Sequence, residues 1–100
     1  MSAPSTGVPT LDRLLGGGPR LSVGMLTADL LVLGREIEVL AATGVELVHV
    51  DVEDGVFCPG ITVGPPVVKA LRTPLLKDFH LMIDDPLTKV GAFVLAGAVT

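Results

Sequence analysis

The sequence predicts an α/β fold that forms the N-terminal half of a TIM (β/α)8 barrel, and three observations support this prediction. Short Val- and Leu-rich runs alternate with segments of helical periodicity, and right-handed crossovers between such units give a parallel sheet with helices outside. The chain is 49% hydrophobic with three Phe and no Trp or Tyr, so its apolar content is aliphatic, as in strands buried on both faces. No Gly-rich phosphate loop follows the first expected strand, which disfavours the alternative, an open doubly wound sheet.

The N-terminal part divides into an extension and a first strand. Residues 1–20 form the expected flexible extension, because residues 1–9 are rich in Ser, Pro and Gly, a composition typical of disorder. One short helix is expected within this extension, over residues 10–15. The partial barrel is expected over residues 21–100, and its first strand over residues 21–26.

The most clearly periodic helix is expected over residues 30–42. Thr27 or Asp29 can cap its start, and Gly44 lies where a left-handed C-terminal cap belongs. Its apolar positions recur at helical spacing, and the charged positions lie mostly off that face. These apolar positions are Leu30, Leu33, Ile37, Leu40 and Ala41.

The rest of the chain continues the alternation of strands and helices. Pro65 and Pro66 open a helix, since Pro is tolerated in a first helical turn. Asp84 and Asp85 precede Pro86 and are expected to supply a capping carboxylate to the last helix. The expected strands are residues 45–52, 75–83 and the beginning of a fourth at 98–100, and the expected helices are residues 65–71 and 87–96.

Composition and charge exclude several classes of function. The formal net charge is −4 and the isoelectric point about 4.8, so we expect no nucleic-acid partner and no anionic membrane partner. The apolar runs are too short for a transmembrane helix, and no secretory signal is recognisable. The single cysteine, Cys58, fits a reducing compartment, and we expect a cytoplasmic protein.

Histidine and carboxylate residues share one face of the second expected strand. Residues two apart in a strand point the same way, so His49, Asp51 and Glu53 lie on one face and the intervening valines on the other. His80 and Met82 share a face of the next strand for the same reason. The polar face would line the mouth of the barrel, where barrel active sites lie.

Two imidazoles and a carboxylate on neighbouring strands can bind Zn²⁺, Fe²⁺ or Mn²⁺ and leave a position open for substrate. The alternative is a structural role, since a lone histidine near a strand end is more often structural than a ligand. Met82 alone is more often core filler. Cys58 has no histidine near it in sequence and is not expected to act as a nucleophile.

Three segments resemble those of the ribulose-phosphate 3-epimerases. Residues 49–68, HVDVEDGVFCPGITVGPPVV, resemble that family's second-strand motif, H-x-D-V-M-D-G-x-F-V-P-N-x-T-x-G-P. Residues 25–29, MLTAD, resemble its I-L-S-A-D segment, and residues 80–86, HLMIDDP, match its H-L-M-x-x-x-P segment. The likeness extends over residues 21–100, in order and with compatible spacing.

The resemblance implies a TIM barrel with one divalent metal ion, zinc or iron in the first place and manganese or cobalt as alternatives. The implied reaction is epimerisation at C3 between D-ribulose 5-phosphate and D-xylulose 5-phosphate; related epimerases that act on allulose 6-phosphate share these motifs. By motif match, His49, Asp51 and His80 are metal ligands, and Asp51 is also a catalytic acid/base. His80 and Met82 would contact the sugar phosphate.

Three residues depart from the family's pattern. Gly24 stands where the family has a serine whose hydroxyl meets the substrate, so that role is not carried over. Glu53 replaces a methionine that shields the enediolate, and a carboxylate there would repel an anionic intermediate unless it is protonated or binds the metal. Gly60 replaces an asparagine of the loop.

The hundred residues hold no counterpart of the family's later strands, which carry its second catalytic aspartate and its phosphate-binding groups. No phosphate-binding residue is therefore expected in this chain, although inversion needs an acid on the opposite face of the substrate. Four barrel strands also leave two open edges. We expect part of a longer enzyme that is incomplete or inactive alone, a half-barrel that forms a homo-oligomer, or a non-catalytic metal-binding or interaction remnant of the fold.

Overall fold

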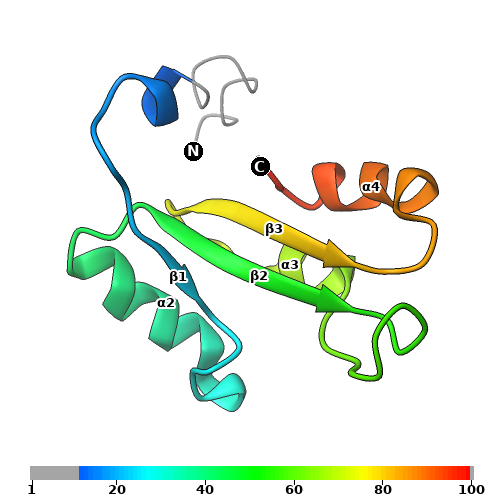
Figure 1. The fold of residues 1–100 in the computed structure, drawn as a ribbon. Helices are drawn as coiled ribbons and strands as arrows, with labels where there is room; N and C mark the ends of the chain where they lie inside the picture. Colours follow the sequence, from blue (N-terminus) through cyan, green and yellow to red (C-terminus); the bar gives the residue numbers. More distant parts are fainter. Residues whose placement is uncertain (1–11, 100) are drawn as a thin grey trace.

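A computed structural model describes residues 12–99 of the chain. Its three strands are parallel and lie in the order β1-β2-β3 (Figure 1). The strands are β1 (Ser22–Gly24), β2 (Leu47–Glu53) and β3 (Leu76–Met82). The helices are the 3-10 turn η1 (Leu30–Val32), α2 (Leu33–Ala42), α3 (Pro65–Ala70) and α4 (Pro86–Leu95). The predicted alternation of strands and helices is therefore confirmed.

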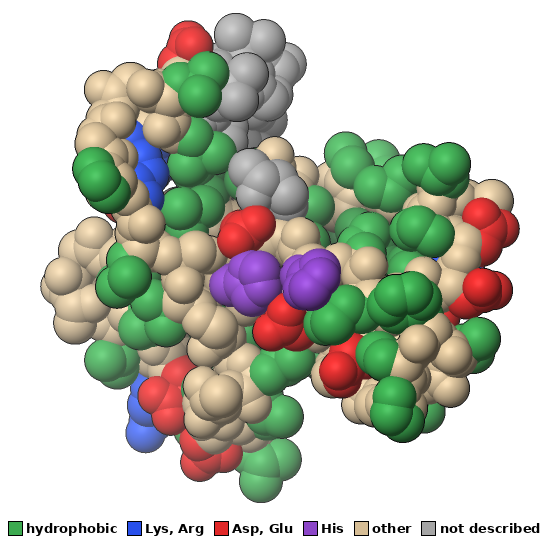
Figure 2. Space-filling view, viewed as in Figure 1, with side chains coloured by type: hydrophobic (Ala, Val, Ile, Leu, Met, Phe, Trp, Pro, Cys, Tyr) green, Lys and Arg blue, Asp and Glu red, His purple; other side chains and the backbone are tan. Residues whose placement is uncertain are grey.

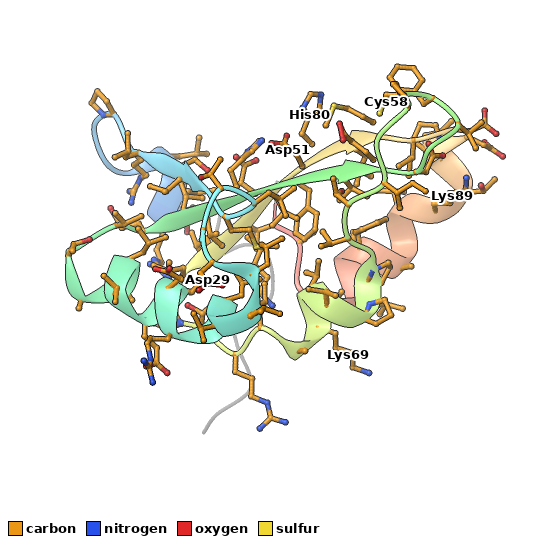
Figure 3. The ribbon with its side chains drawn as sticks, turned by 90° about the horizontal axis from the view of Figure 1, so that it is seen from below. Asp29, Asp51, Cys58, Lys69, His80 and Lys89 are labelled. Carbon is orange, nitrogen blue, oxygen red and sulfur yellow. The ribbon has the colours of Figure 1, made fainter. Side chains whose placement is uncertain are left out.

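The sheet separates a helical layer from an open face. Helices α2 and α3 lie on one side of it, and Asp51 and His80 project from the other (Figure 3). This is the layering of a barrel segment, in which the helices cover the outside of the sheet. None of the helices within residues 12–99 has the length and apolar character needed to cross a lipid bilayer.

The hydrophobic core lies between the sheet and its helices. Val48 and Val50 of β2 are fully buried on the helical side of the sheet. Each of α2, α3 and α4 adds one buried side chain to the same cluster: Ile37, Val68 and Phe93, respectively. Because alternate residues of β2 enter this core, the intervening residues must face the open side.

The helix expected over residues 30–42 begins with a tighter turn than the sequence predicts. Of the two expected caps, Asp29 is the one used: its carboxylate accepts a hydrogen bond from the Leu31 N–H, at 3.1 Å. Regular α-helix starts only at Leu33, and Leu30 remains largely exposed. Gly44 has a φ of +90°, which confirms the left-handed C-terminal cap.

The predicted carboxylate cap of the last helix is wrong. Asp85 has a left-handed backbone (φ 50°, ψ 61°) and its side chain makes no capping hydrogen bond, whereas a capping residue is typically extended. The turn is bound to another loop instead: the Asp84 N–H donates to the Asp54 carboxylate at 2.7 Å.

The expected fourth strand is present as a single parallel bridge. Gly97, with a φ of +112°, turns the chain back towards β3, where Ala98 pairs with Lys77. The Val99 N–H then donates to the Lys77 carbonyl at 2.9 Å. In the extension, residues 12–15 of the expected short helix are helical, and the expected disorder of residues 1–9 lies outside the described residues.

Candidate metal centre

Strand register brings the predicted site residues together on the open face of the sheet. In the parallel pairing of β2 and β3, Asp51 is opposite His80 and Glu53 is opposite Met82. His49 precedes Asp51 by two residues and therefore points to the same side. Figure 2 shows the two histidines next to each other near the centre of the open face, beside acidic side chains.

Three of these side chains form a compact cluster of donor atoms. His49, Asp51 and His80 each offer one ligand-type atom, and these atoms lie within 4.8 Å of one another. Asp51 is the centre of the cluster: its Oδ1 lies 3.0 Å from His49 Nε2 and 3.4 Å from His80 Nδ1. The cluster is partly open to solvent, since His80 is exposed and the other two are half-buried.

Asp78 is a fourth polar residue of this face, and the sequence analysis missed it. Its Oδ2 lies 2.8 Å from His49 Nδ1 and accepts a hydrogen bond from the Ser22 hydroxyl at 3.0 Å. The signal was available, because Asp78 precedes His80 by two residues and must share its face. A carboxylate that holds one imidazole nitrogen fixes the direction of the other, as partners of metal-bound histidines commonly do.

His49 is thus held between two carboxylates. The hydrogen bond to Asp78 raises the pKa of His49, the bond to Asp51 raises it further, and partial burial opposes both. Because carboxylates only accept hydrogen bonds, both ring nitrogens donate when the imidazole is protonated. The Nε2 proton of His49 would lie between Nε2 and Asp51 Oδ1, and it would have to leave before this nitrogen could bind a cation.

The donor set fits a divalent metal ion. Two imidazole nitrogens and one carboxylate oxygen converge, which is a ligand combination typical of catalytic zinc and non-haem iron sites. Three protein ligands leave coordination positions for substrate or water. Within residues 12–99, this is the one group of three or more such residues whose donor atoms converge in this way.

The other predicted residues lie around this cluster. Met82 is half-buried and follows His80 by two residues, so it lies on the same face of β3. Glu53 begins on this face as well, but its carboxylate lies against Gly60 in the loop that follows β2. Gly24 is the register partner of His49, and a Cβ added there would meet nothing within 4 Å.

Thr62 fixes the end of β2 beneath the site. Its hydroxyl donates to the Asp51 carbonyl at 2.8 Å and accepts from the Glu53 N–H at 2.9 Å. The Thr62 N–H donates to the Glu53 carbonyl at 3.1 Å. These contacts hold the loop against the strand and so fix the backbone next to Asp51.

Asp54 ties the same loop to the turn after β3. Its carboxylate accepts hydrogen bonds from the N–H groups of Asp84, Val56 and Phe57, and these bonds lower its pKa to about 2. Cys58 lies in this loop and its thiol donates to the Met82 carbonyl at 3.6 Å. Burial raises the pKa of the Cys58 thiol, which disfavours the reactive thiolate.

The fold and the cluster together define the class of protein: a segment of a parallel α/β barrel whose open sheet face carries a candidate metal centre. Comparison with known proteins gives the family. Residues 20–100 match the model of the ribulose-phosphate 3 epimerase family, and the chain belongs to this family.

Three relatives illustrate the match. The chain is 43% identical over 81 residues to ribulose-phosphate 3-epimerase of Bacillus subtilis, and the alignment covers 79% of the chain and 37% of that protein. It is 42% identical over 90 residues to the chloroplastic ribulose-5-phosphate-3-epimerase of Arabidopsis thaliana, covering 88% and 32%. It is 41% identical over 91 residues to ribulose-phosphate 3-epimerase of Rhodobacter capsulatus, covering 89% and 38%. The chain therefore spans about a third of the length of these relatives.

Proposed function

We propose that this chain supplies the N-terminal part of a ribulose-phosphate 3-epimerase, an isomerase that interconverts D-ribulose 5-phosphate and D-xylulose 5-phosphate. The observation that carries the proposal is the convergence of His49, Asp51 and His80 on the open face of the sheet, in a chain from this family. Barrel enzymes perform their chemistry at the carboxyl ends of the strands, and Asp51 and His80 lie in the carboxyl-terminal halves of β2 and β3.

His49, Asp51 and His80 would hold one divalent metal ion, with zinc or iron favoured by the donor set and manganese or cobalt as alternatives. When bound, such an ion acts as a Lewis acid that stabilises negative charge developing on the substrate oxygens. Asp78 would keep His49 in the orientation that directs its Nε2 into the centre.

Asp51 would also transfer the proton at C3 of the sugar phosphate. Its carboxylate is half-buried at the centre of the cluster, within reach of a substrate bound over the open face. His80 and Met82 flank that position on β3 and would contact the substrate. Epimerisation also needs an acid on the opposite face of the substrate. We propose that this acid, and the phosphate-binding groups, come from barrel strands beyond these hundred residues.

A chimera with a relative tests the proposal. In it, this chain replaces the matched segment of the B. subtilis epimerase, so that the relative supplies the rest of the barrel. We expect the purified chimera to convert ribulose 5-phosphate into xylulose 5-phosphate and to hold one metal ion per chain. Asp51→Asn should abolish turnover in the chimera, whereas Glu38→Gln, a change of an exposed carboxylate on α2, should leave it intact.

The outcomes separate the candidate functions. A chimera that folds and binds metal without turnover would contradict the epimerase proposal and favour a non-catalytic metal-binding role. Turnover of allulose 6-phosphate alone would keep the reaction class and change the substrate. Turnover that survives Asp51→Asn would remove Asp51 from the mechanism.

We also propose that the open edges of the sheet are covered, either within a closed barrel or by a second copy of the chain. Within residues 12–99, β1 pairs with β2 alone, so its other edge has unpaired backbone groups. Size-exclusion chromatography of the chain alone distinguishes a dimer from a monomer. Because the substrate is a sugar phosphate and the lone cysteine suits a reducing compartment, the cytoplasm is the proposed location.

A further inference from the structure

The Glu53 side chain leaves β2 beside the candidate metal centre, but its carboxylate lies outside the centre. Glu53 is the last residue of β2 and follows Asp51 by two positions, so its side chain leaves the strand on the same face. A carboxylate there is a metal-ligand type and carries a negative charge. Among the described residues, however, the converging donor atoms belong to His49, Asp51 and His80 and do not include Glu53.

The Glu53 carboxylate occupies the place where residue 60 would have a side chain. A Cβ added to Gly60 would overlap the Glu53 Oε2 atom and lie 3.1 Å from its Cδ and 3.4 Å from its Oε1. The φ of Gly60 is not positive, so its backbone conformation does not itself require glycine. Glycine at this position therefore matters for the space it leaves to Glu53.

The backbone gives this contact little freedom to relax. Thr62 is hydrogen bonded to Glu53 through both its hydroxyl and its N–H, and Asp54 forms an antiparallel bridge with Ile61. These links hold residues 53 and 60 at a fixed separation. A side chain at residue 60 would be accommodated by rotation of the flexible Glu53 side chain, which would move the carboxylate back over the open face.

The Cys58 thiol in the same loop has a pKa that depends on the Glu53 carboxylate. Cys58 lies on the same side of the sheet as Asp51 and His80 (Figure 3). Burial raises the pKa of its thiol, and the negative charge of Glu53 raises it further. The reactivity of Cys58 therefore reports where the carboxylate lies, without any metal or substrate.

We propose that Gly60 is a positioning residue of the metal centre, because its missing side chain leaves the space that holds the Glu53 carboxylate away from His49, Asp51 and His80. The inference rests on the proposed metal-binding function for its consequence, but its geometry concerns only residues 53 and 60. Holding this charge aside keeps a coordination position and the adjacent volume open for an anionic sugar phosphate.

The variants Gly60→Ala and Glu53→Ala, made singly and together in the full chain, test the proposal. Gly60→Ala should raise the affinity for Zn²⁺, measured by competition with a chromophoric chelator, by about tenfold. A carboxylate beside a divalent ion attracts it even in water, and the expected tenfold gain corresponds to ~1.4 kcal/mol. In the Glu53→Ala background, the same Gly60→Ala change should leave the zinc affinity within about twofold, which is the ordinary limit of additivity.

Alkylation of Cys58 in the metal-free chain is the second readout. Gly60→Ala should speed alkylation severalfold when Glu53 is present and leave it unchanged in Glu53→Ala. Equal zinc affinities in wild type and Gly60→Ala, with equal alkylation rates, would overturn the proposal. So would the same change in both backgrounds.

The alkylation arm also separates this inference from the proposed function. A chain that binds no zinc but shows the Glu53-dependent alkylation change would refute the metal site and leave the coupling of residues 53 and 60 intact. If circular dichroism shows that the Gly60→Ala variant does not fold, the Glu53→Asp variant is used instead. The shorter side chain withdraws the carboxylate from residue 60, and faster alkylation with tighter zinc binding is again the expected result.

Discussion

The two faces of β2 differ in what they require of a side chain. On the helical face, Val48 and Val50 are fully buried against residues from three helices. On the open face, His49 and Asp51 are half-buried and hydrogen bonded to each other. Stability and chemistry are therefore divided between alternate residues of one strand.

The polar face satisfies its own hydrogen-bonding groups. Ser22 donates to Asp78, Asp78 accepts from His49, and His49 bonds to Asp51. Polar groups that are hydrogen bonded and partly solvated lose little solvation free energy on folding. This face can therefore hold charge without weakening the fold. Changes on the two faces should therefore separate stability from metal binding.

The largest effect is expected from charge on the helical face. Val50→Asp places an unpaired carboxylate among apolar side chains, where no polar group can compensate its lost hydration. We expect a loss of more than about 4 kcal/mol, which is enough to unfold a marginally stable domain. Circular dichroism during heating measures it. A cooperative transition near that of the wild type would show that the face is not buried.

The opposite change on the open face should spare the fold. Asp51→Val replaces a half-buried carboxylate with a strand-favouring residue, and we expect a stability change within about 1 kcal/mol. Zinc affinity should fall by more than about 100-fold, since even outer partners of metal ligands contribute roughly 10- to 100-fold. Calorimetric titration of the folded variant with zinc checks this. Retained affinity would remove Asp51 from the centre.

Asp78→Asn should have a smaller effect on the same centre. The amide keeps the shape of the side chain but lacks the charge that holds the His49 Nδ1–H. The three candidate ligands, His49, Asp51 and His80, are unchanged. Zinc affinity should fall by about tenfold. Ser22→Ala, which removes only the hydroxyl that donates to Asp78, is the matched control and should cost less. An unchanged affinity in Asp78→Asn would show that His49 does not depend on this carboxylate.

The pH dependence of the metal-free chain should reveal the paired state of His49. Because its pKa is raised on folding, the protonated imidazole stabilises the fold fully below about pH 6.5, the unfolded value, and this contribution is lost as the pH rises through the raised pKa. Zinc affinity should rise over the same range, since zinc displaces the proton. Unfolding by denaturant between about pH 5.5 and pH 8.5 measures the first trend. A His49 that titrates below its ordinary value in NMR would contradict it.

The smallest effect is expected at Gly24. The space around an added Cβ is open to 4 Å, so Gly24→Ser should change the unfolding free energy by less than about 0.5 kcal/mol. Zinc affinity should also stay within about twofold, because residue 24 offers no ligand to the cluster. A large loss of stability would mean that the chain around β1 packs more closely than its register with His49 indicates.

Much of the site was predictable because the strand period is fixed. The pleat alone assigns His49, Asp51 and Glu53 to one face, and the structure has them there. The same period would have found Asp78 from His80. The register that sets Asp51 opposite His80 was not available from spacing, since it depends on how the crossover through α3 packs.

The errors lie where distant residues decide local structure. The cap expected at Asp85 fails because its turn is bound to Asp54, thirty residues away from Asp84. The direction of the Glu53 side chain depends on the space left by Gly60, which no periodicity in β2 reveals. Local patterns predict which face a residue takes, whereas contacts across loops decide where a flexible side chain ends.

X-ray absorption spectroscopy at the zinc edge of the zinc-loaded chain tests the candidate centre most directly. We expect one zinc per chain with two imidazole nitrogens and a carboxylate oxygen at about 2.0–2.2 Å. His80→Ala should then remove one imidazole from the spectrum. A sulfur neighbour at about 2.3 Å, which only Cys58 or a methionine could supply, or a spectrum unchanged by His80→Ala, would contradict the centre formed by His49, Asp51 and His80.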